Sequence, residues 1–288
     1  MNLYWWNDIP NVGDVASEYV ISKLSGENIK WKEPQRTISK YVKKTIKNVL
    51  KGKFKISSLA EFVYPWEKCL FAIGSILDYA NKKTICWGSG FREPYSKYHG
   101  GIVVAVRGKL SRDILPHHQD IPLGDPALLL PLLYKPKVTD RQDFIKIIPH
   151  FLDYNDMYEQ YSNKYKIIDI RTKNVESFID QIVSSKFILS TSLHGLIIAH
   201  AYGIPALWII NGSIASSGFK FYDYFSSVNI PQYDGFTNIN KILSSHNNIE
   251  KLFEENIDKS QINISLKELQ HNLLRVAPFK LKSQYYYI

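Results

Sequence analysis

Short apolar runs recur along the whole chain, each followed by small or polar residues and then by a segment that begins like a helix. The runs are Leu3–Trp6, Cys69–Ile73, Thr84–Trp87, Ile102–Val106, Phe144–Ile148, Tyr165–Ile170, Phe187–Leu189 and Pro205–Ile210. Runs that are apolar throughout are typical of strands covered on both faces in parallel α/β sheets. The pattern therefore predicts an α/β protein with two Rossmann-like lobes.

Chain length and a proline-containing interruption predict two domains. A chain of 288 residues exceeds the usual size of one compact unit. Two prolines and two lysines between residues 131 and 137 interrupt the strand–helix pattern. We therefore expect an N-terminal lobe over 1–136, a C-terminal lobe over 137–288 and a cleft between them. An amphipathic helix is expected near the C-terminus, over Leu266–Leu274.

The net charge of +9 indicates an anionic partner, which could be nucleic acid, an anionic membrane surface or a phosphorylated substrate. No nucleic-acid-binding motif is recognised and the basic residues are scattered, so we do not expect a nucleic-acid partner. The lysine-dense segment Arg36–Lys55 fits a solvated helix, a mobile insertion or a membrane-facing surface.

Both cysteines, Cys69 and Cys86, lie in apolar surroundings without the spacing of metal ligands, so they are predicted to be buried thiols. Buried thiols suit a reducing compartment. No segment reaches the roughly 18 apolar residues that span a bilayer. We expect a soluble cytoplasmic protein, with peripheral contact at the inner face of the plasma membrane left open.

Ligands of parallel α/β sheets bind beyond the carboxyl ends of the strands, so the residues after each run are candidates. After the first run, Asn11, Gly13 and Asp14 form a polar turn in which Asp14 is the expected N-cap of a helix that stops at Gly26. After the third, the small residues in the Gly88-Ser89 turn would let backbone N–H groups approach a ligand.

A strand-end arginine is a candidate for gripping phosphate or carboxylate. Arg107 directly follows Ile102–Val106, where its guanidinium would face the cleft, whereas Arg112 falls inside the next helix. Asp125 stands at another strand-to-turn corner, where it could cap a helix or orient an arginine.

The sharpest candidate site is the start of a helix expected over Leu193–Tyr202. Ser192, Leu193 and His194 lie where unpaired N–H groups and the helix dipole attract phosphate or carboxylate. The imidazole of His194 exchanges a proton near neutral pH, which predicts an acid–base role. His200, deeper in the same helix, is expected to be structural.

Two more elements should face the same cleft. His150 follows the first strand of the second half, and Lys220 follows its last clear strand and could neutralise a phosphate. Tyr222 and Tyr224 could stack on a sugar ring, although an ordinary helix start explains this segment as well.

These residues together resemble the polysaccharide pyruvyl transferase family. The resemblance is carried by Asn11-Val12-Gly13-Asp14, Gly88-Ser89-Gly90, the run from Ala105 to Arg112, Gly124-Asp125-Pro126-Ala127, Ile148-Pro149-His150, the run from Ser192 to Leu196, and Gly218-Phe219-Lys220-Phe221. The order and spacing of these motifs look most like the branch that acts on bacterial exopolysaccharide and capsule intermediates.

The resemblance implies a glycosyltransferase-B-like pair of Rossmann lobes. It also implies transfer of pyruvate from phosphoenolpyruvate to two sugar hydroxyls as a cyclic ketal, most simply across positions 4 and 6 of a hexose. His194 matches the family's proposed acid, and Arg107 matches an arginine implicated in holding phosphoenolpyruvate. Several members carry arginine where this chain has Ser192, so other cations must hold the donor, and Lys220 is the candidate.

No metal or resident cofactor is expected beyond phosphoenolpyruvate as co-substrate. A lipid-linked acceptor would suit the basic segment Lys40–Lys55, while free and nucleotide-linked sugars stay open. The alternative enzyme is a nucleotide-sugar-dependent glycosyltransferase of the same two-lobe architecture, and the alternative outside enzymes is a nucleic-acid-binding protein.

Overall fold

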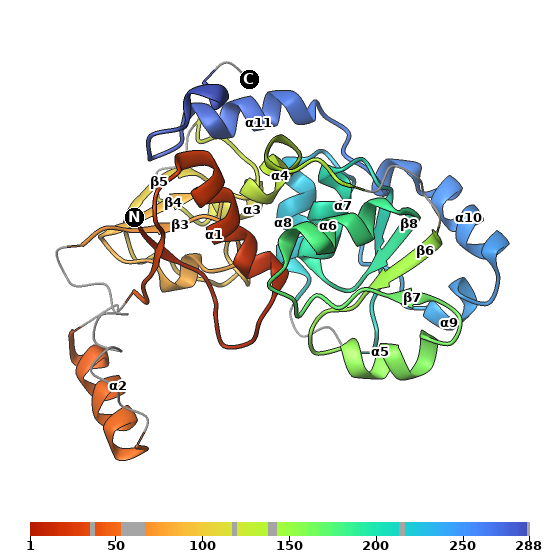
Figure 1. Ribbon diagram of the computed structural model, residues 1–288, viewed down its shortest axis with the longest axis horizontal. Helices are drawn as coiled ribbons and strands as arrows, with labels where there is room; N and C mark the ends of the chain where they lie inside the picture. The colour runs from red at the N-terminus through yellow and green to blue at the C-terminus, as the bar shows by residue number, and fades with distance from the viewer. Residues whose placement is uncertain (35–37, 53–66, 117–119, 138–142, 213–216, 287–288) are drawn as a thin grey trace.

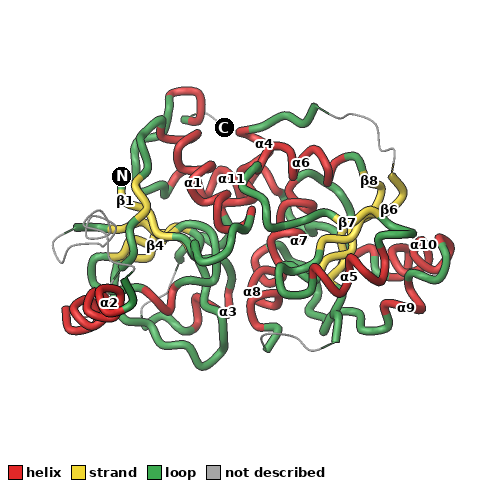
Figure 2. Tube along the Cα trace, turned by 60° about the horizontal axis from the view of Figure 1, so that its bottom comes forward, coloured by secondary structure: helices red, strands yellow, loops and turns green. Residues whose placement is uncertain are grey.

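The computed structural model describes residues 1–34, 38–52, 67–116, 120–137, 143–212 and 217–286, and shows two parallel β-sheets flanked by helices (Figures 1 and 2). The first sheet has the order β2-β1-β3-β4-β5 and the second β7-β6-β8-β9, with every neighbouring pair parallel. The α/β class predicted from the sequence is confirmed.

The strands of the first sheet are β1 (Asn2–Tyr4), β2 (Lys30–Trp31), β3 (Cys69–Phe71), β4 (Thr84–Trp87) and β5 (Ile102–Ala105), and those of the second are β6 (Asp143–Ile148), β7 (Lys166–Ile167), β8 (Ser185–Ser190) and β9 (Ala206–Trp208). Each predicted apolar run overlaps one of these strands, and β1, β6 and β8 begin one or two residues before their runs. The sequence pattern missed β2, because a two-residue strand beginning with lysine has no apolar run to reveal it.

The α-helices are α1 (Val12–Ser25), α2 (Ile38–Leu50), α3 (Lys109–Asp113), α4 (Leu130–Leu133), α5 (Tyr154–Tyr161), α6 (Val175–Val183), α7 (Leu193–Ala201), α8 (Phe219–Ser227), α9 (Ile239–Ile242), α10 (His246–Glu255) and α11 (Leu266–Arg275). The short 3₁₀ turns are η2 (Leu77–Tyr79), η3 (Pro126–Leu129), η4 (Ile257–Lys259) and η5 (Ser283–Tyr285). Of the predicted basic segment, residues 36, 37 and 53–55 lie outside the described part of the chain.

Helix α1 begins three residues earlier than the sequence suggested. Asn11, not Asp14, is its N-cap, because the Asn11 side chain accepts a hydrogen bond from the Gly13 N–H at 2.9 Å. Asp14 instead lies in the first turn, where a carboxylate favours the positive end of the helix dipole. Gly26 ends the helix in the left-handed region at φ 74°, as predicted.

One buried apolar cluster joins elements of both halves. It contains Leu3 and Val20 from the first half together with Ile179 and Leu196 from the second, all at 0% exposure. The backbone links the halves as well, because the Val12 N–H donates to the Ile170 carbonyl at 2.9 Å. The elements that carry the predicted site residues are therefore held against one another by the core.

Helix α11 returns to the first half of the chain. The Trp87 indole N–H donates to the Leu273 carbonyl at 2.9 Å, and the Gln270 amide donates to the Leu128 carbonyl at 2.7 Å. The domain division near residue 136 stays a prediction, and this helix, which it places in the C-terminal lobe, contacts Trp87 and Leu128 of the N-terminal half.

Cys69 and Cys86 are free and buried, as predicted. None of the helices in the described residues is both long enough and apolar enough to cross a bilayer.

Candidate functional site

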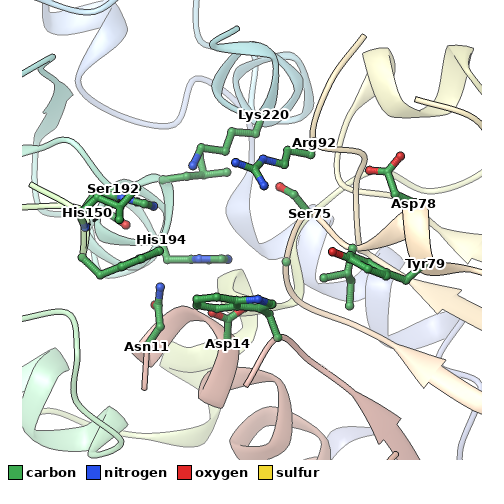
Figure 3. A pocket seen from close by; sticks show the side chains of 16 residues that line it. Asn11, Asp14, Ser75, Asp78, Tyr79, Arg92, His150, Ser192, His194 and Lys220 are labelled. Atoms are coloured by element: carbon green, nitrogen blue, oxygen red, sulfur yellow. Dashed lines mark hydrogen bonds between the residues drawn. The ribbon is translucent and has the colours of Figure 1, made fainter. Parts of the chain in front are cut away.

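A pocket of about 380 Å³ opens where elements of both halves meet (Figure 3). Its lining comes from the segments that follow strands β1, β3, β4, β6, β8 and β9, so the carboxyl ends of both sheets converge on it. The lining residues are Trp6, Asn11, Asp14, Gly74, Ser75, Ile76, Asp78, Tyr79, Arg92, His150, Phe151, Leu152, Ser192, Leu193, His194 and Lys220. The aromatic rings of Trp6 and Phe151 stack at one wall, with centroids 5.4 Å apart.

The start of α7 forms one wall of the pocket. Ser192 is the N-cap, with extended backbone angles, and its side chain makes no capping hydrogen bond to the described residues of the helix. The backbone N–H groups in the first turn of α7, where Leu193 and His194 line the pocket, are therefore able to bind an anion. The predicted helix start and the pocket therefore coincide.

Two glycines allow α7 to approach its neighbours closely, Gly13 at the contact with α1 and Gly195 at the contact with β6 and β8. A Cβ atom at Gly13 would overlap the imidazole ring of His194, and one at Gly195 would overlap the Ser190 hydroxyl and lie 2.9 Å from an Ile148 methyl carbon. Gly13 does not line the pocket directly but leaves the space in which the His194 ring lies. Any larger residue there would move the ring or the helix.

His150 is held in place by the loop that follows β8. Its backbone N–H donates to the Thr191 hydroxyl oxygen at 2.7 Å, and that hydroxyl donates to Asp153 at 2.6 Å. The imidazole of His150 packs against Phe151 with ring centroids 4.3 Å apart. This arrangement turns the strand-end histidine toward the same space as His194 (Figure 3).

The pocket concentrates basic groups, and their pKa values reflect it. Burial lowers the pKa of His194 to about 3, assisted by the charges of Arg107 and Lys220, and lowers that of His150 to about 4. Burial and the neighbouring charges of Arg107 and Arg92 lower the pKa of Lys220 to about 8. A bound anion would relieve this repulsion and raise all three values, so the pocket is suited to a multiply charged anion.

Asp14 supplies an acidic group to the pocket, one residue after the glycine that lies against the His194 ring. Burial raises the pKa of its carboxyl to about 7, an effect that the charge of Lys220 partly opposes. A carboxyl with a pKa near neutrality is able to accept or donate a proton under physiological conditions. Asp14 therefore has the properties of a second acid–base group beside His194.

Arg107 is fully buried, at 0% exposure, and does not line the pocket. Its Nε donates to Asp223 at 2.9 Å, Nη1 to the Ser75 hydroxyl at 2.6 Å and Nη2 to the Phe91 carbonyl at 2.7 Å. The structure corrects the prediction that this guanidinium faces the cleft, because buried partners already engage it. It ties β5 to α8 and fixes Ser75 at the pocket wall.

Three other predicted residues also lie behind the pocket rather than in it. Ser89 is at 0% exposure and donates to the Ala72 carbonyl at 3.1 Å. Gly88 lies against Pro126, and a Cβ there would overlap the proline ring. Tyr224, at 0% exposure, bonds to Nδ1 of His200 at 3.0 Å, so it cannot stack on a sugar. His200 is structural, as predicted.

Several lining residues escaped the sequence interpretation. Ser75 follows β3 and Trp6 follows β1, so the strand-end rule would have found both. Arg92 lies in the loop that follows β4 and lines the pocket from the side opposite α7 (Figure 3). Arg92 gives the pocket a guanidinium group, which the serine at position 192 does not provide. Asp78 and Tyr79 lie in the 3₁₀ turn η2, which has no sequence signature.

The sequence pattern of the polysaccharide pyruvyl transferase family matches residues 11–213. The chain belongs to this family. The matched region contains Asn11, Asp14, His150 and His194, while Lys220 lies beyond it. An uncharacterized protein of Acanthamoeba polyphaga mimivirus is 29% identical over 231 residues, which cover 74% of this chain and 80% of that protein.

Membership in the family identifies an enzyme that transfers pyruvyl groups to polysaccharide. The resemblance found in the sequence motifs is thereby confirmed at the level of the family. Of the residues named from those motifs, the structure brings Asn11, Asp14, His150, Ser192, Leu193, His194 and Lys220 together in one pocket.

Proposed function

We propose that this polysaccharide pyruvyl transferase takes pyruvate from phosphoenolpyruvate and attaches it to two hydroxyls of a hexose as a 4,6-ketal. The acceptor would be a precursor of a bacterial exopolysaccharide or capsule. The observation that carries the proposal is the pocket in which Lys220, Arg92 and His150 surround the start of α7 beside His194. Phosphoenolpyruvate carries a phosphate and a carboxylate, and this cluster offers partners for both.

Phosphoenolpyruvate would be held without an arginine at position 192, directly before Leu193 and His194. Lys220 and the free N–H groups of α7 suit the phosphate, because both provide donors to oxygen in a site of low exposure. Arg92 suits the carboxylate, since its planar guanidinium matches a carboxylate in bidentate fashion. Arg107 would act indirectly, by fixing Ser75.

The chemistry would begin with a proton from His194 to the methylene carbon of phosphoenolpyruvate. This step leaves oxocarbenium character at the central carbon, which one sugar hydroxyl attacks as it loses its own proton. Asp14 is suited to accept that proton, given its pKa of about 7. Cleavage of the bond between the central carbon and the phosphate oxygen would release phosphate, which takes the proton held by Asp14. Attack by the second hydroxyl, whose proton returns to His194, would then close the ketal.

Protonation of His194 would depend on the donor itself. Burial and the charges of Arg107 and Lys220 hold its pKa at about 3, which keeps the imidazole neutral at pH 7. A phosphate dianion beside the ring would stabilise the imidazolium and raise that pKa. The acid would thus be loaded only when its substrate is in place.

The two parallel sheets with a shared pocket fit a glycosyltransferase-B-like pair of lobes, divided near residue 136, with the donor between them. We further propose a cytoplasmic enzyme, where phosphoenolpyruvate and sugar precursors are both available.

Phosphate release from phosphoenolpyruvate tests this function directly. The purified chain is incubated with the donor and a panel of galactosides, glucosides and N-acetylmannosaminides, and the mass of each product is measured. The proposal expects phosphate release that depends on one acceptor and a product heavier by a pyruvate ketal. Nucleotide release from nucleotide sugars, with none of phosphate from phosphoenolpyruvate, would replace it with a glycosyltransferase.

A further inference from the structure

Helix α2 projects away from the two sheets (Figure 1). Its apolar side chains are exposed: Val42 by 45%, Ile46 and Val49 by 52% each, and Leu50 by 82%. Their spacing of four, three and one residues puts them in one sector of the helix, at about 100° per residue. The helix therefore presents an apolar stripe that the described part of the chain leaves uncovered.

Helices α10 and α11 are also amphipathic, but their apolar residues are buried. Ile249 and Phe253 of α10 are 0% and 4% exposed, and Leu269 and Leu273 of α11 are 4% and 0% exposed. Both of these amphipathic helices bury their apolar side against the core. The apolar stripe of α2 differs because it is exposed to solvent. We therefore expect a binding partner outside the described chain to cover it.

The positive charge of α2 indicates that the partner is anionic. The helix sequence contains four lysines and no acidic residue. Lys43, Lys47 and the following Lys51 are exposed, and they lie beside or opposite the apolar stripe. Two copies of this helix would bring like charges together, whereas an anionic lipid surface attracts the lysines and accepts the apolar stripe.

We propose that α2 binds the surface of an anionic phospholipid bilayer, with Val42, Ile46 and Val49 at the hydrocarbon boundary and the lysines among the headgroups. Long lysine side chains are suited to this arrangement, because their methylene stems reach from the boundary to the charged region. The binding does not depend on the proposed donor. Its consequence, access to a saccharide carried on a lipid, does rest on the proposed function.

Vesicle flotation with the full chain tests the binding. Vesicles of phosphatidylcholine alone are compared with vesicles that also contain phosphatidylglycerol, in the absence of any substrate. The wild type is expected to float with the anionic vesicles only. Removing three charges as Lys43→Gln, Lys47→Gln and Lys51→Gln should weaken binding on the order of 100-fold, at about five-fold for each lysine.

The apolar stripe is tested by the triple change Val42→Gln, Ile46→Gln and Val49→Gln, which should also abolish flotation. The matched control is Lys241→Gln, Lys251→Gln and Lys267→Gln, which removes the same charge from three exposed positions elsewhere and should retain flotation. Each variant should keep wild-type turnover with a water-soluble acceptor. Equal flotation of all variants, or a concentration-dependent dimer lost with the stripe while no vesicle binding occurs, would overturn the proposal.

A separate observation concerns the wall behind His194. Nε2 of His194 and Oδ2 of Asp125 are both buried, lie 4.0 Å apart and have no hydrogen-bond partner among the described residues. The other oxygen of Asp125 accepts a hydrogen bond from the Ala127 N–H at 2.9 Å. Two buried orphan atoms that face each other across one short gap indicate a contact that a small shift would complete.

We infer that Asp125 is the positioning residue of His194. A His194 Nε2–H donated to Asp125 would fix the tautomer and leave Nδ1 as the nitrogen that exchanges protons with substrate. The carboxylate would also support the imidazolium once the donor has entered. The other charged or titratable groups around the pair are Arg107, Asp223, Lys220, His150 and Tyr224.

Asp125→Asn tests this role, because asparagine keeps the oxygen that caps η3 while replacing the one that faces His194. We expect turnover to fall by roughly 100-fold or more with little change in donor affinity, and the pH optimum to move down as His194 loses its carboxylate. Nitrogen NMR of labelled histidine should show Nε2–H in the wild type and a different tautomer in the variant.

Asp180→Asn is the matched control, since this carboxylate accepts a hydrogen bond from the Tyr134 hydroxyl away from the pocket. It should leave turnover, pH optimum and tautomer unchanged. An Asp125→Asn enzyme with wild-type turnover and pH optimum, or a wild-type His194 protonated on Nδ1 alone, would overturn the inference. The expected changes in turnover and pH optimum rest on the proposed function, whereas the tautomer is read from the protein alone and so separates this inference from a failure to find the acceptor.

Discussion

Two basic side chains that follow apolar strands, His194 after β8 and Arg107 after β5, have opposite surroundings. His194 lines the pocket, and its buried Nε2 has no partner among the described residues. Arg107 is fully buried and donates to Asp223, Ser75 and Phe91. A strand-end position therefore does not by itself make a ligand-binding residue, because the partners available in the folded chain decide which donors remain free.

The largest expected effect is on turnover, at His194. His194→Ala should lower kcat by about 10²- to 10⁴-fold, the usual contribution of a positioned general acid, while donor affinity stays within a few-fold. Phosphate release measures the first and direct titration with phosphoenolpyruvate the second. The melting temperature should change little, since the ring makes no hydrogen bond to the described residues through Nε2.

His200→Ala is the matched change on the same helix. Both nitrogens of His200 have partners, Tyr224 and the Ala206 carbonyl, each at 3.0 Å. This variant should lose stability rather than turnover per folded molecule. Near wild-type turnover in His194→Ala would remove that residue from the mechanism and with it the contrast between the two strand ends.

The next effect is on stability, at Arg107. Arg107→Ala leaves Asp223 buried without its charged partner, and breaking a buried ion pair in this way costs about 3 to 5 kcal/mol of unfolding free energy. Urea denaturation measures the loss. The double variant Arg107→Met with Asp223→Asn should recover part of it, because no uncompensated charge then remains. An Arg107→Ala enzyme of unchanged stability that fails to bind donor would show that the guanidinium serves the substrate instead.

The smallest effect is on donor affinity and its pH dependence, at Lys220. Lys220→Met should weaken phosphoenolpyruvate binding by roughly 10- to 150-fold, the equivalent of about 1.5 to 3 kcal/mol for a hydrogen bond to a charged group. In the wild type the Lys220 pKa of about 8 must rise when the anion binds, so binding takes up a proton above pH 8. Affinity should therefore fall as pH increases from 8 to about 9.

Calorimetry in two buffers of different ionisation enthalpy measures that proton uptake. Lys220→Met should remove the component that arises above pH 8, whereas Lys241→Met, at an exposed position, should leave it intact. Affinity that rises over this pH range would contradict the assignment of Lys220 to the phosphate.

Much of the fold could be predicted because the signals are local. Apolar runs marked eight strands, and Gly26 and Ser192 marked helix ends within a residue or two of where they lie. The N-cap of α1 was misassigned by three positions, since Asn11 and Asp14 are both favourable caps and the backbone angles that choose between them are absent from the sequence. The two-residue strand β2 depends on its neighbour β1 and has no signal of its own.

By itself the sequence determined the α/β class, eight of the nine strands in the described residues, the family to which the chain belongs and the position of His194 at the start of a helix. Each of these depends on residue type and spacing over a short stretch of chain. Only the tertiary structure decided that Arg107 is paired with Asp223, that Arg92 and Ser75 line the pocket, and that Asp125 faces His194. Those relations join residues far apart in sequence, and they follow from how the two sheets and their helices pack, which no local pattern specifies.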